Sequence, residues 1–348
     1  MLKNSFKELE MRKKYAISLA ITFLLTYSSN VIAQAEMNAK TQVIVKSKYG
    51  SADGEFGLKV FEDQSWAEPS GIAVDLKGNI YIADPLNNRI QKFDKTGKFM
   101  FKISLNIQKK LQRFGKTIND ITVDREDNLY AVSGHEQRIF KYNEVGQFIQ
   151  SISLKEMDIA WDRWRGWRSG IYLQPKRISV DKIGNIYLES SNELIKFSKE
   201  GKLSKKWVRE GGSNEASYFI EQTGLLYFSR QIGVWEKYDQ NGNLLGTVVC
   251  EKEPLSVYIP TAGGQCQFPP KFIDKNGLRY YFELTLKTSD LISIVKVDQS
   301  GNLKRYKAPP VDIWQSPNMI KFDDDGYLYG YDYDNTKQEY WVIRMKLE

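Results

Sequence analysis

The fold is decided by the stretch PSGIAVDLKGNIYIADPLNNRIQKFDKTGKF, residues 69–99. Its first apolar run ends at Asp75, and Gly78 and Tyr81 follow at intervals of three residues. An aspartate side chain can bond back onto a turn backbone, and glycine supplies the positive φ that such turns use. The D-x-x-G unit therefore predicts a tight turn between two short strands.

A second turn, FDKTG at residues 93–97, follows within the same stretch. It joins a third strand to a fourth by the same combination of a polar residue and a glycine. The whole stretch is thus predicted to be a four-stranded antiparallel meander.

This pair of turns repeats along the chain. The first turn occurs six times, as DLKGNIY (75–81), DREDNLY (124–130), DKIGNIY (181–187), EQTGLLY (221–227), DKNGLRY (274–280) and DDDGYLY (323–329). The second turn occurs five times, at 93–97, 142–146, 197–201, 238–242 and 297–301. Units of this length with four strands are typical of propeller blades. The tyrosines at equivalent positions predict packing between blades.

The sixth unit lacks a fourth strand, because its third strand, residues 341–347, ends next to the last residue of the chain. Residues 42–48 form an apolar strand that has no blade of its own. Pairing this strand with the last blade leaves no edge without a partner there. We therefore expect an all-β fold, a six-bladed β-propeller of four-stranded antiparallel blades, closed by the N-terminal strand over residues 36–348.

The first unit resembles an NHL repeat along nearly its whole length. The hallmark D-x-x-N-x-R-I-x-x-F is present as Asp84, Asn87, Arg89, Ile90 and Phe93. The second unit has Ser133 in place of the aspartate, and later units keep little beyond their turns. The resemblance implies a six-bladed propeller, here an exported, bacterial-type member, but this family hosts unrelated activities and the fold does not give the function.

Residues 1–35 have the order of a secretory signal peptide. Lys13 and Lys14 precede an apolar run at 15–25, and the sequence AQA at 33–35 offers a small-residue cleavage site. The run is short for a membrane span, so a membrane anchor is the weaker alternative. We expect an exported protein, periplasmic or extracellular. Removal of these residues takes away five basic and two acidic side chains, which lowers the net charge from +7 to +4. Such a mild charge does not predict nucleic-acid binding.

Two cysteines, Cys250 and Cys266, fall in the exported part. An oxidising compartment would allow them to pair. The bridge would close a loop of about 15 residues and stabilise the fold by roughly 3 kcal/mol. Zinc-site spacings are absent.

Enzymatic chemistry has few candidates in this sequence. His135 is the single histidine, so a His-ligated zinc site or a catalytic triad could use only that one. Propellers that resemble gluconolactonases use acidic and amide side chains around one divalent ion. The matching candidates are Glu68, Asn119, Asp120 and Asn318. This alternative, a metal-dependent hydrolase, would need Ca²⁺ or another divalent ion; otherwise we expect no cofactor.

A binding surface has a clearer candidate, the segment WDRWRGWR at 161–168. It lies in an enlarged crossover between the second and third units, on the face where propellers usually bind ligands. Tryptophan and arginine are frequent in binding hot spots. The candidate ligand residues are Trp161, Arg163, Trp164, Arg165, Trp167, Arg168, Lys176, Arg177 and Lys271. The alternative is that the tryptophans pack at the junction between blades and the arginines are solvated.

Three functions follow from these observations. The one we favour is a non-enzymatic exported propeller that binds a protein, a peptide or a glycan, with an anionic ligand favoured by the basic residues. The second is the metal-dependent hydrolase. The third, RNA binding, is disfavoured by export.

Overall fold

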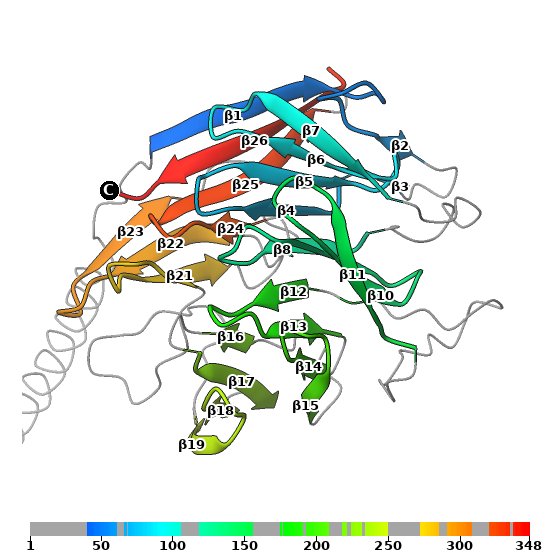
Figure 1. The fold of residues 1–348 in the computed structure, drawn as a ribbon. Helices are drawn as coiled ribbons and strands as arrows, with labels where there is room; N and C mark the ends of the chain where they lie inside the picture. The colour runs from blue at the N-terminus through cyan, green and yellow to red at the C-terminus, as the bar shows by residue number, and fades with distance from the viewer. Residues whose placement is uncertain are drawn as a thin grey trace, which may run out of the picture.

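The computed structural model describes residues 40–60, 66–67, 69–105, 118–155, 175, 177–190, 193–208, 218–220, 224–231, 234–249, 272–284, 291–307, 320–334 and 337–348. These residues form strands and turns. Six sheets of four antiparallel strands are arranged as a six-bladed β-propeller, as the repeats predicted (Figure 1).

The first three blades follow one another along the chain. Blade 1 consists of β4 (Gly71–Val74), β5 (Ile80–Asp84), β6 (Arg89–Phe93) and β7 (Phe99–Ser104). Blade 2 consists of β8 (Asp120–Val123), β9 (Leu129–Ser133), β10 (Arg138–Tyr142) and β11 (Phe148–Ser153). Blade 3 consists of β12 (Arg177–Val180), β13 (Ile186–Glu189), β14 (Glu193–Phe197) and β15 (Leu203–Val208).

The last three blades continue the series. Blade 4 consists of β16 (Tyr218–Ile220), β17 (Leu226–Gln231), β18 (Val234–Tyr238) and β19 (Leu244–Val249). Blade 5 consists of β20 (Phe272–Ile273), β21 (Arg279–Leu284), β22 (Leu291–Val297) and β23 (Leu303–Lys307). Blade 6 consists of β24 (Lys321–Phe322), β25 (Tyr327–Asp334), β26 (Glu339–Lys346) and β1 (Lys40–Lys48). A small separate sheet pairs β2 (Lys59–Val60) with β3 (Trp66–Ala67).

The ring closes through the N-terminal strand, as predicted. Strand β1 lies antiparallel to β26, with Lys40 opposite Lys346 and Lys48 opposite Glu339 (Figure 1). The pairing is interrupted by a bulge at Ile44, between Val43 and Val45. The first and last strands of the propeller are therefore held in one sheet, which removes the free edge that each would otherwise present.

The turns have the geometry expected from their sequences. All ten turn glycines of the two series have positive φ, and Asp127, which replaces the glycine of blade 2, has φ 61°. In the first turn, Asp75 Oδ1 accepts hydrogen bonds from the backbone N–H groups of Lys77 at 3.0 Å and Asn79 at 2.8 Å. These local bonds explain why so short a motif specifies each blade.

The repeated tyrosines pack between blades, as predicted. Tyr81 of blade 1 lies in one buried cluster with Ile121 and Leu129 of blade 2, and Tyr329 of blade 6 lies in another with Ile72 of blade 1. Four of these tyrosines also donate their hydroxyl to the turn aspartate of their own blade, through the pairs Tyr130–Asp124, Tyr187–Asp181, Tyr280–Asp274 and Tyr329–Asp323. One residue thus ties the turn to the interface between blades.

A basic residue accompanies each tyrosine on the neighbouring strand. The pairs in register are Tyr81–Lys92, Tyr130–Lys141, Tyr187–Lys196, Tyr227–Lys237, Tyr280–Lys296 and Tyr329–Arg344. Lys92 Nζ lies 4.6 Å from the centre of the Tyr81 ring and 3.3 Å from Asp75 Oδ2. It also donates to the backbone oxygen of Glu144, in the second turn of blade 2. The cation–π contact and the ion pair thus hold Lys92 within blade 1, and its hydrogen bond to Glu144 joins blade 1 to blade 2.

Candidate functional site

The ring has two faces with different connections. We call the face with the two series of D-type turns the turn face. The opposite face carries the loops between second and third strands and the crossovers between blades, and we call it the loop face. The hallmark residues of blade 1 and the starts of the first strands lie on the loop face.

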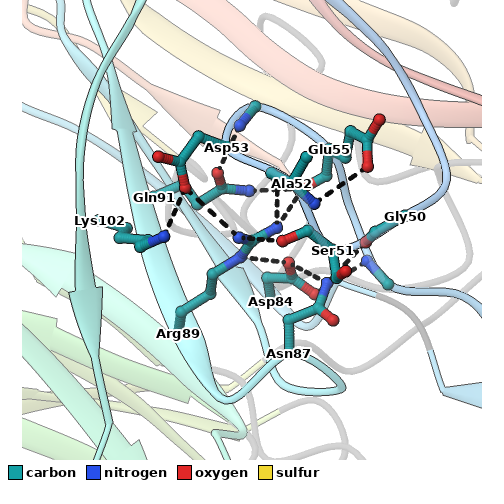
Figure 2. A network of polar contacts seen from close by, with 12 residues as sticks. Gly50, Ser51, Ala52, Asp53, Glu55, Asp84, Asn87, Arg89, Gln91 and Lys102 are labelled. Carbon is teal, nitrogen blue, oxygen red and sulfur yellow. Dashed lines mark hydrogen bonds and ion pairs between the residues drawn. The ribbon is translucent and has the colours of Figure 1, made fainter.

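In blade 1 the hallmark residues hold the crossover that leads out of β1. Arg89 is 4% exposed, and its guanidinium donates to the backbone oxygens of Ser51, Ala52 and Glu55 at 2.7–2.9 Å. Its Nε donates to Asp84 Oδ2 at 3.0 Å. Figure 2 shows the guanidinium enclosed between this carboxylate and the loop.

The remaining groups around Arg89 are also occupied. Asp84 accepts from the backbone N–H of Gly57 at 3.0 Å and from the side chain of Asn87 at 2.9 Å. Gln91 accepts from Gly54 and donates to Glu55 (Figure 2). Burial raises the pKa of Asp84, against the hydrogen bonds and the Arg89 charge that lower it. This network fixes the crossover at the closure of the ring, so the hallmark has a structural role here.

Blade 2 lacks this arrangement. Ser133 replaces the aspartate, and its hydroxyl accepts from the backbone N–H of Glu136 at 3.1 Å. Arg138 donates instead to the hydroxyl of Ser151 on the outer strand of its own blade at 2.8 Å. The hallmark arginine thus holds a crossover only where the aspartate is also present, in the two blades compared.

A cavity of about 370 Å³ occupies the centre of the ring. It is lined by the first strands of all six blades and by the turns that follow several of them. Polar wall residues include Thr122, Arg177, Ser179, Tyr218 and Lys321. Apolar wall residues include Val123, Val180, Ile220, Phe272, Ile320 and Phe322. This volume lies in the range of small-molecule sites.

Asp120 lies beside this channel at the loop-face end of β8 and is fully buried. Its Oδ2 accepts from the backbone N–H of Ile178 in blade 3 at 2.9 Å. Its Oδ1 lies 3.7 Å from Lys321 Nζ of blade 6. Gly71 of blade 1 stands between these blades, where a Cβ would lie 3.0 Å from Asp120 Oδ1. Burial raises the pKa of Asp120, and the Lys321 charge and the Ile178 hydrogen bond oppose that shift.

Arg177 is held in place by residues of blades 3 and 4. Its Nε donates to Glu189 Oε2 at 2.6 Å, and its guanidinium carbon lies 5.4 Å from the centre of the Tyr218 ring. Burial acts most strongly and lowers the pKa of Arg177, but the charges of Glu189, Tyr218 and Asp120 and the hydrogen bond to Glu189 together hold the pKa above its ordinary value. The arginine is therefore a fixed cation in the channel wall.

Ser179 and Tyr218 complete this part of the wall, with 3.0 Å between their hydroxyl oxygens. Burial raises the pKa of Tyr218. A phenol with a raised pKa is protonated at neutral pH, so it cannot remove a proton from Ser179. The pair can donate or accept hydrogen bonds, but it does not form an activated nucleophile.

Three residues selected from the sequence lie at this mouth of the channel. Asp120 and Arg177 are near enough for their charges to interact. Asn119 lies beside them in the chain, and its Oδ1 accepts from the backbone N–H of Gly134 at 2.7 Å. Asn119 Oδ1 and Asp120 Oδ2 thus accept hydrogen bonds within the protein, and Asp120 Oδ1 has Lys321 at ion-pair distance. No three acidic, histidine or cysteine side chains gather around a common point in the described part of the chain.

The other selected residues lie outside the described residues. These are Trp161, Arg163, Trp164, Arg165, Trp167, Arg168, Lys176 and Lys271 of the ligand set, Glu68 and Asn318 of the metal set, Cys250 and Cys266, and the expected signal peptide at 1–35. Where the structure does describe the chain, it contains no apolar helix of membrane-spanning length.

His135 lies in the loop between β9 and β10 and is half-buried. Its Nε2 is 3.8 Å from Glu136 Oε1. Among the described residues, the ion-pair partner of His135 is thus its neighbour in the chain.

Glu189, Tyr218 and Lys321 were not selected from the sequence. Glu189 ends β13 at the position that Ala83 occupies in β5 and Val132 in β9, opposite the residue that begins each first strand. An acidic residue where the other two blades have an apolar one could have singled out Glu189 from the sequence alone. Lys321 offered a weaker signal, because it replaces a small or apolar residue two positions before the turn aspartate in the other blades. Tyr218 precedes its turn acid by three residues, and no local pattern distinguishes it.

Comparisons with known proteins agree with the propeller. No family model matches the chain. B-box type zinc finger protein ncl-1 of Caenorhabditis elegans is 52% identical over 56 residues, which make up 16% of this chain and 6% of that protein. Protein brain tumor of Drosophila melanogaster is 40% identical over 79 residues, 22% of this chain and 7% of that protein. These relatives are NHL-type proteins, and the chain spans less than a tenth of their length.

Solved structures match over most of the ring. A streptogramin B lyase superposes with a TM-score of 0.50 at 12% identity, covering 90% of this chain and 100% of the lyase. Virginiamycin B lyase from Staphylococcus aureus superposes with a TM-score of 0.50 at 14% identity, covering 89% of this chain and 100% of the lyase. At these identities the likeness shows the propeller fold alone.

Proposed function

We propose that this protein is an exported, non-enzymatic propeller that recognises a protein, peptide or glycan on its loop face, without a bound cofactor. The partial NHL-type relatives support a scaffold of this kind. The export signal of residues 1–35 supports a periplasmic or extracellular location.

One observation carries the proposal. The described side chains at the loop-face mouth that could do chemistry are engaged with other groups of the protein: Asp120 with a backbone amide, and Arg177 with Glu189. Groups held in this way are preorganised for recognition and lose little freedom when a ligand binds. They do not form the pairing of nucleophile and base that covalent catalysis requires.

The segment at 161–168 is the proposed contact surface. It belongs to the connection between Ser153, which ends β11, and Arg177, which begins β12 at the channel mouth. Its tryptophans can stack on sugar rings or apolar side chains, and its arginines can pair with anionic groups.

The test uses the mature chain, residues 36–348, to capture partners by crosslinking in the envelope of its native source. A Trp164→Ala/Arg165→Ala variant removes one stacking face and one charge from the loop face. A Lys182→Ala/Ile183→Ser variant on the turn face is the control, because both residues lie in the first turn of blade 3 and Ile183 is 52% exposed. We expect the loop-face variant to lose captured partners while keeping its melting temperature, and the control to keep both. Equal capture by all three forms would contradict the proposal.

A metal titration separates binding from the hydrolase alternative. A melting temperature that rises with Ca²⁺ or Zn²⁺, and does so only while Asp120 is present, would favour the hydrolase. We expect no such rise, because the described oxygens of Asp120 and Asn119 already accept hydrogen bonds or face a lysine.

A further inference from the structure

We propose that the channel is itself a receptor for a small monocarboxylate with an apolar body, bound by Arg177 and Lys321. This inference deepens the proposed function, since it assigns a ligand class to the channel below the loop face. It rests on the arrangement of charges around the cavity.

Arg177 is positioned to bind an anion. Its Nε is tied to Glu189 at 2.6 Å, and its plane lies over Tyr218. The two terminal nitrogens have no hydrogen-bond partner recorded among the described residues, and the side chain is 21% exposed and lines the cavity. A guanidinium fixed through Nε leaves its terminal edge for a planar, two-oxygen acceptor.

Lys321, at the start of β24 in blade 6, supplies a second cation. It lines the cavity, and its Nζ reaches Asp120 only at ion-pair distance, 3.7 Å. Asp120 Oδ1 is buried and has no hydrogen-bond partner within the described structure. Lys321 therefore retains donor capacity toward the cavity, and an acceptor there would satisfy it.

The counter-ions of the two cations, Glu189 for Arg177 and Asp120 for Lys321, lie outside the cavity wall. Asp120 and Glu189 are 0% and 2% exposed, and neither lines the cavity, whereas Arg177 and Lys321 do. Five carboxylates also line the cavity, but they lie in the first turns at its turn-face end: Asp75, Asp124, Asp181, Asp323 and Asp324. At the loop-face end a ligand therefore meets Arg177 and Lys321, and the charges of these two cations and of Asp120 and Glu189 sum to zero there. A single negative charge is the smallest addition to such a balanced cluster, which favours a carboxylate over a doubly charged phosphate.

The rest of the wall selects the body of the ligand. Phe272 and Phe322 stack with ring centres 4.7 Å apart and an interplanar angle of 6°, and both line the cavity together with Ile320. Apolar surface beside a small number of placed polar groups is the usual composition of a small-molecule site. The ligand class is thus a carboxylate carried on an aromatic or aliphatic body.

Calorimetric titration at pH 7 with 4-phenylbutyrate tests the inference on the mature chain. The neutral isostere 4-phenylbutanamide has the same body without the charge. We expect the acid to bind at least tenfold more tightly than the amide, and inorganic phosphate to compete weakly. An acid and an amide of equal affinity, or no binding of the acid, would overturn the inference.

Variants locate the binding. Lys321→Met is expected to weaken the acid at least tenfold, whereas Lys95→Met, at an exposed lysine of the second turn of blade 1 that does not line the cavity, is expected to leave its affinity unchanged. Because Arg177→Gln alone would strand the buried Glu189, the arginine is tested as Arg177→Gln/Glu189→Gln, with a melting curve to show folding. This pair is also expected to weaken the acid tenfold or more. If Lys321→Met and the folded double variant both bind normally, the site is wrong.

Two further measurements identify the source of the carboxylate and separate the channel inference from the loop-face proposal. A dipeptide, acetyl-Leu-Phe, is compared with its C-terminal amide; discrimination between them would support a peptide terminus as the source, and binding of phenylbutyrate alone would support a free acid. Partner capture at the loop face is repeated with Lys321→Met. We expect Lys321→Met to lose acid binding and to keep partner capture. A wild-type chain that captures its partner but binds no acid overturns only the channel inference, whereas intact acid binding with capture that does not depend on Trp164 and Arg165 overturns only the loop-face proposal.

Discussion

The turn face and the loop face of this propeller are built in different ways. On the turn face, a turn acid, a tyrosine and a basic residue occur in every blade at the same register. On the loop face, equivalent positions hold different residues, such as Ala83, Val132 and Glu189 near the end of the second strand. Repetition on one face maintains the ring, and variation on the other gives each blade a separate chemical character.

Two buried carboxylates of the loop face and three exposed carboxylates of the second turns also differ in the direction of their pKa shifts. Asp84 and Asp120 on the loop face have pKa values raised by burial. In the second turns, Asp94, Asp239 and Asp298 have pKa values lowered by hydrogen bonds from the turn, the largest coming from Thr96, Asn243 and Asn302 respectively. Burial thus disfavours the ionised form of the two loop-face carboxylates, whereas turn hydrogen bonds stabilise the ionised form of the exposed carboxylates in the second turns.

The largest expected effect comes from breaking the loop-face network of blade 1. Asp84→Ala leaves the buried Arg89 with only the half-exposed carboxylate of Asp53 at 3.8 Å and should lower the free energy of unfolding by about 3–5 kcal/mol. Ser133→Ala, at the equivalent position of blade 2, removes one acceptor and should cost about 1 kcal/mol. Urea denaturation of both variants measures the difference. Equal losses would show that the hallmark aspartate has no special role.

A second comparison separates the closure of the ring from a turn elsewhere. Gly97 and Gly301 occupy the same turn position with φ 88° and 86°. A Cβ on Gly97 would collide with the carbonyl oxygen of Ile44 at the β1 bulge, whereas none of the described atoms lies within 4 Å of a Cβ on Gly301. Alanine at either site should cost about 1–2 kcal/mol for its positive φ, and the clash should add roughly 1–3 kcal/mol at Gly97.

Hydrogen exchange of the backbone amides shows where the structure is weakened in Gly97→Ala. Gly97→Ala should speed exchange of the β1 amides that pair with β26, and Gly301→Ala should leave them protected. Unchanged protection of β1 in Gly97→Ala would contradict the assignment of this glycine to ring closure.

A smaller effect distinguishes two tyrosines of the turn face. The hydroxyl of Tyr130 donates to Asp124 at 3.0 Å, but the hydroxyl of Tyr81 is buried without a hydrogen-bond partner among the described residues. Tyr130→Phe should therefore lower the free energy of unfolding by about 1–2 kcal/mol, and Tyr81→Phe should change it by less than about 0.5 kcal/mol. Thermal and urea unfolding measure both. A larger loss for Tyr81→Phe would show that its hydroxyl is engaged.

The smallest effect is a difference in pH dependence between the faces. With its pKa raised in the folded state, Asp120 binds its proton more tightly there, so its contribution to stability falls as the pH rises from near 4 through the raised value. With its pKa lowered, Asp239 contributes stability above pH 4 that is lost as the pH falls through the lower value. The stability difference between wild type and Asp120→Asn should therefore decrease with pH, and that for Asp239→Asn should increase.

Denaturation curves at several values between pH 3 and pH 7 test these slopes. Slopes of the same sign for the two variants would contradict the contrast between the faces.

Much of the fold could be predicted because its signals are local. Asp75 and the turn amides that it binds lie within four residues, so the turn is encoded in a single short segment. Asp127 could be placed in a glycine position by its alignment with the other copies, and its positive φ agrees. The Tyr81–Lys92 pairing could also have been found, since a basic residue precedes the last residue of β6 and recurs in each blade.

The channel could be predicted only in part. Asp120 and Arg177 were selected because they begin their first strands, but their partners depend on other blades. Lys321 reaches Asp120 past Gly71, a contact between residues some 200 positions apart. The repeat pattern of the sequence does not predict how far the side chain of a lysine extends into the channel.

The sequence by itself determined the number of blades, the position of each turn and the strand that closes the ring. It could do so because turn hydrogen bonds and strand pairing are satisfied over short or repeated intervals. Only the tertiary structure decided that the guanidinium of Arg89 is hydrogen-bonded to the backbone of a crossover, while that of Arg177 faces a cavity. Both are arginines at one end of a strand, and what separates them is whether backbone oxygens of another segment surround the guanidinium.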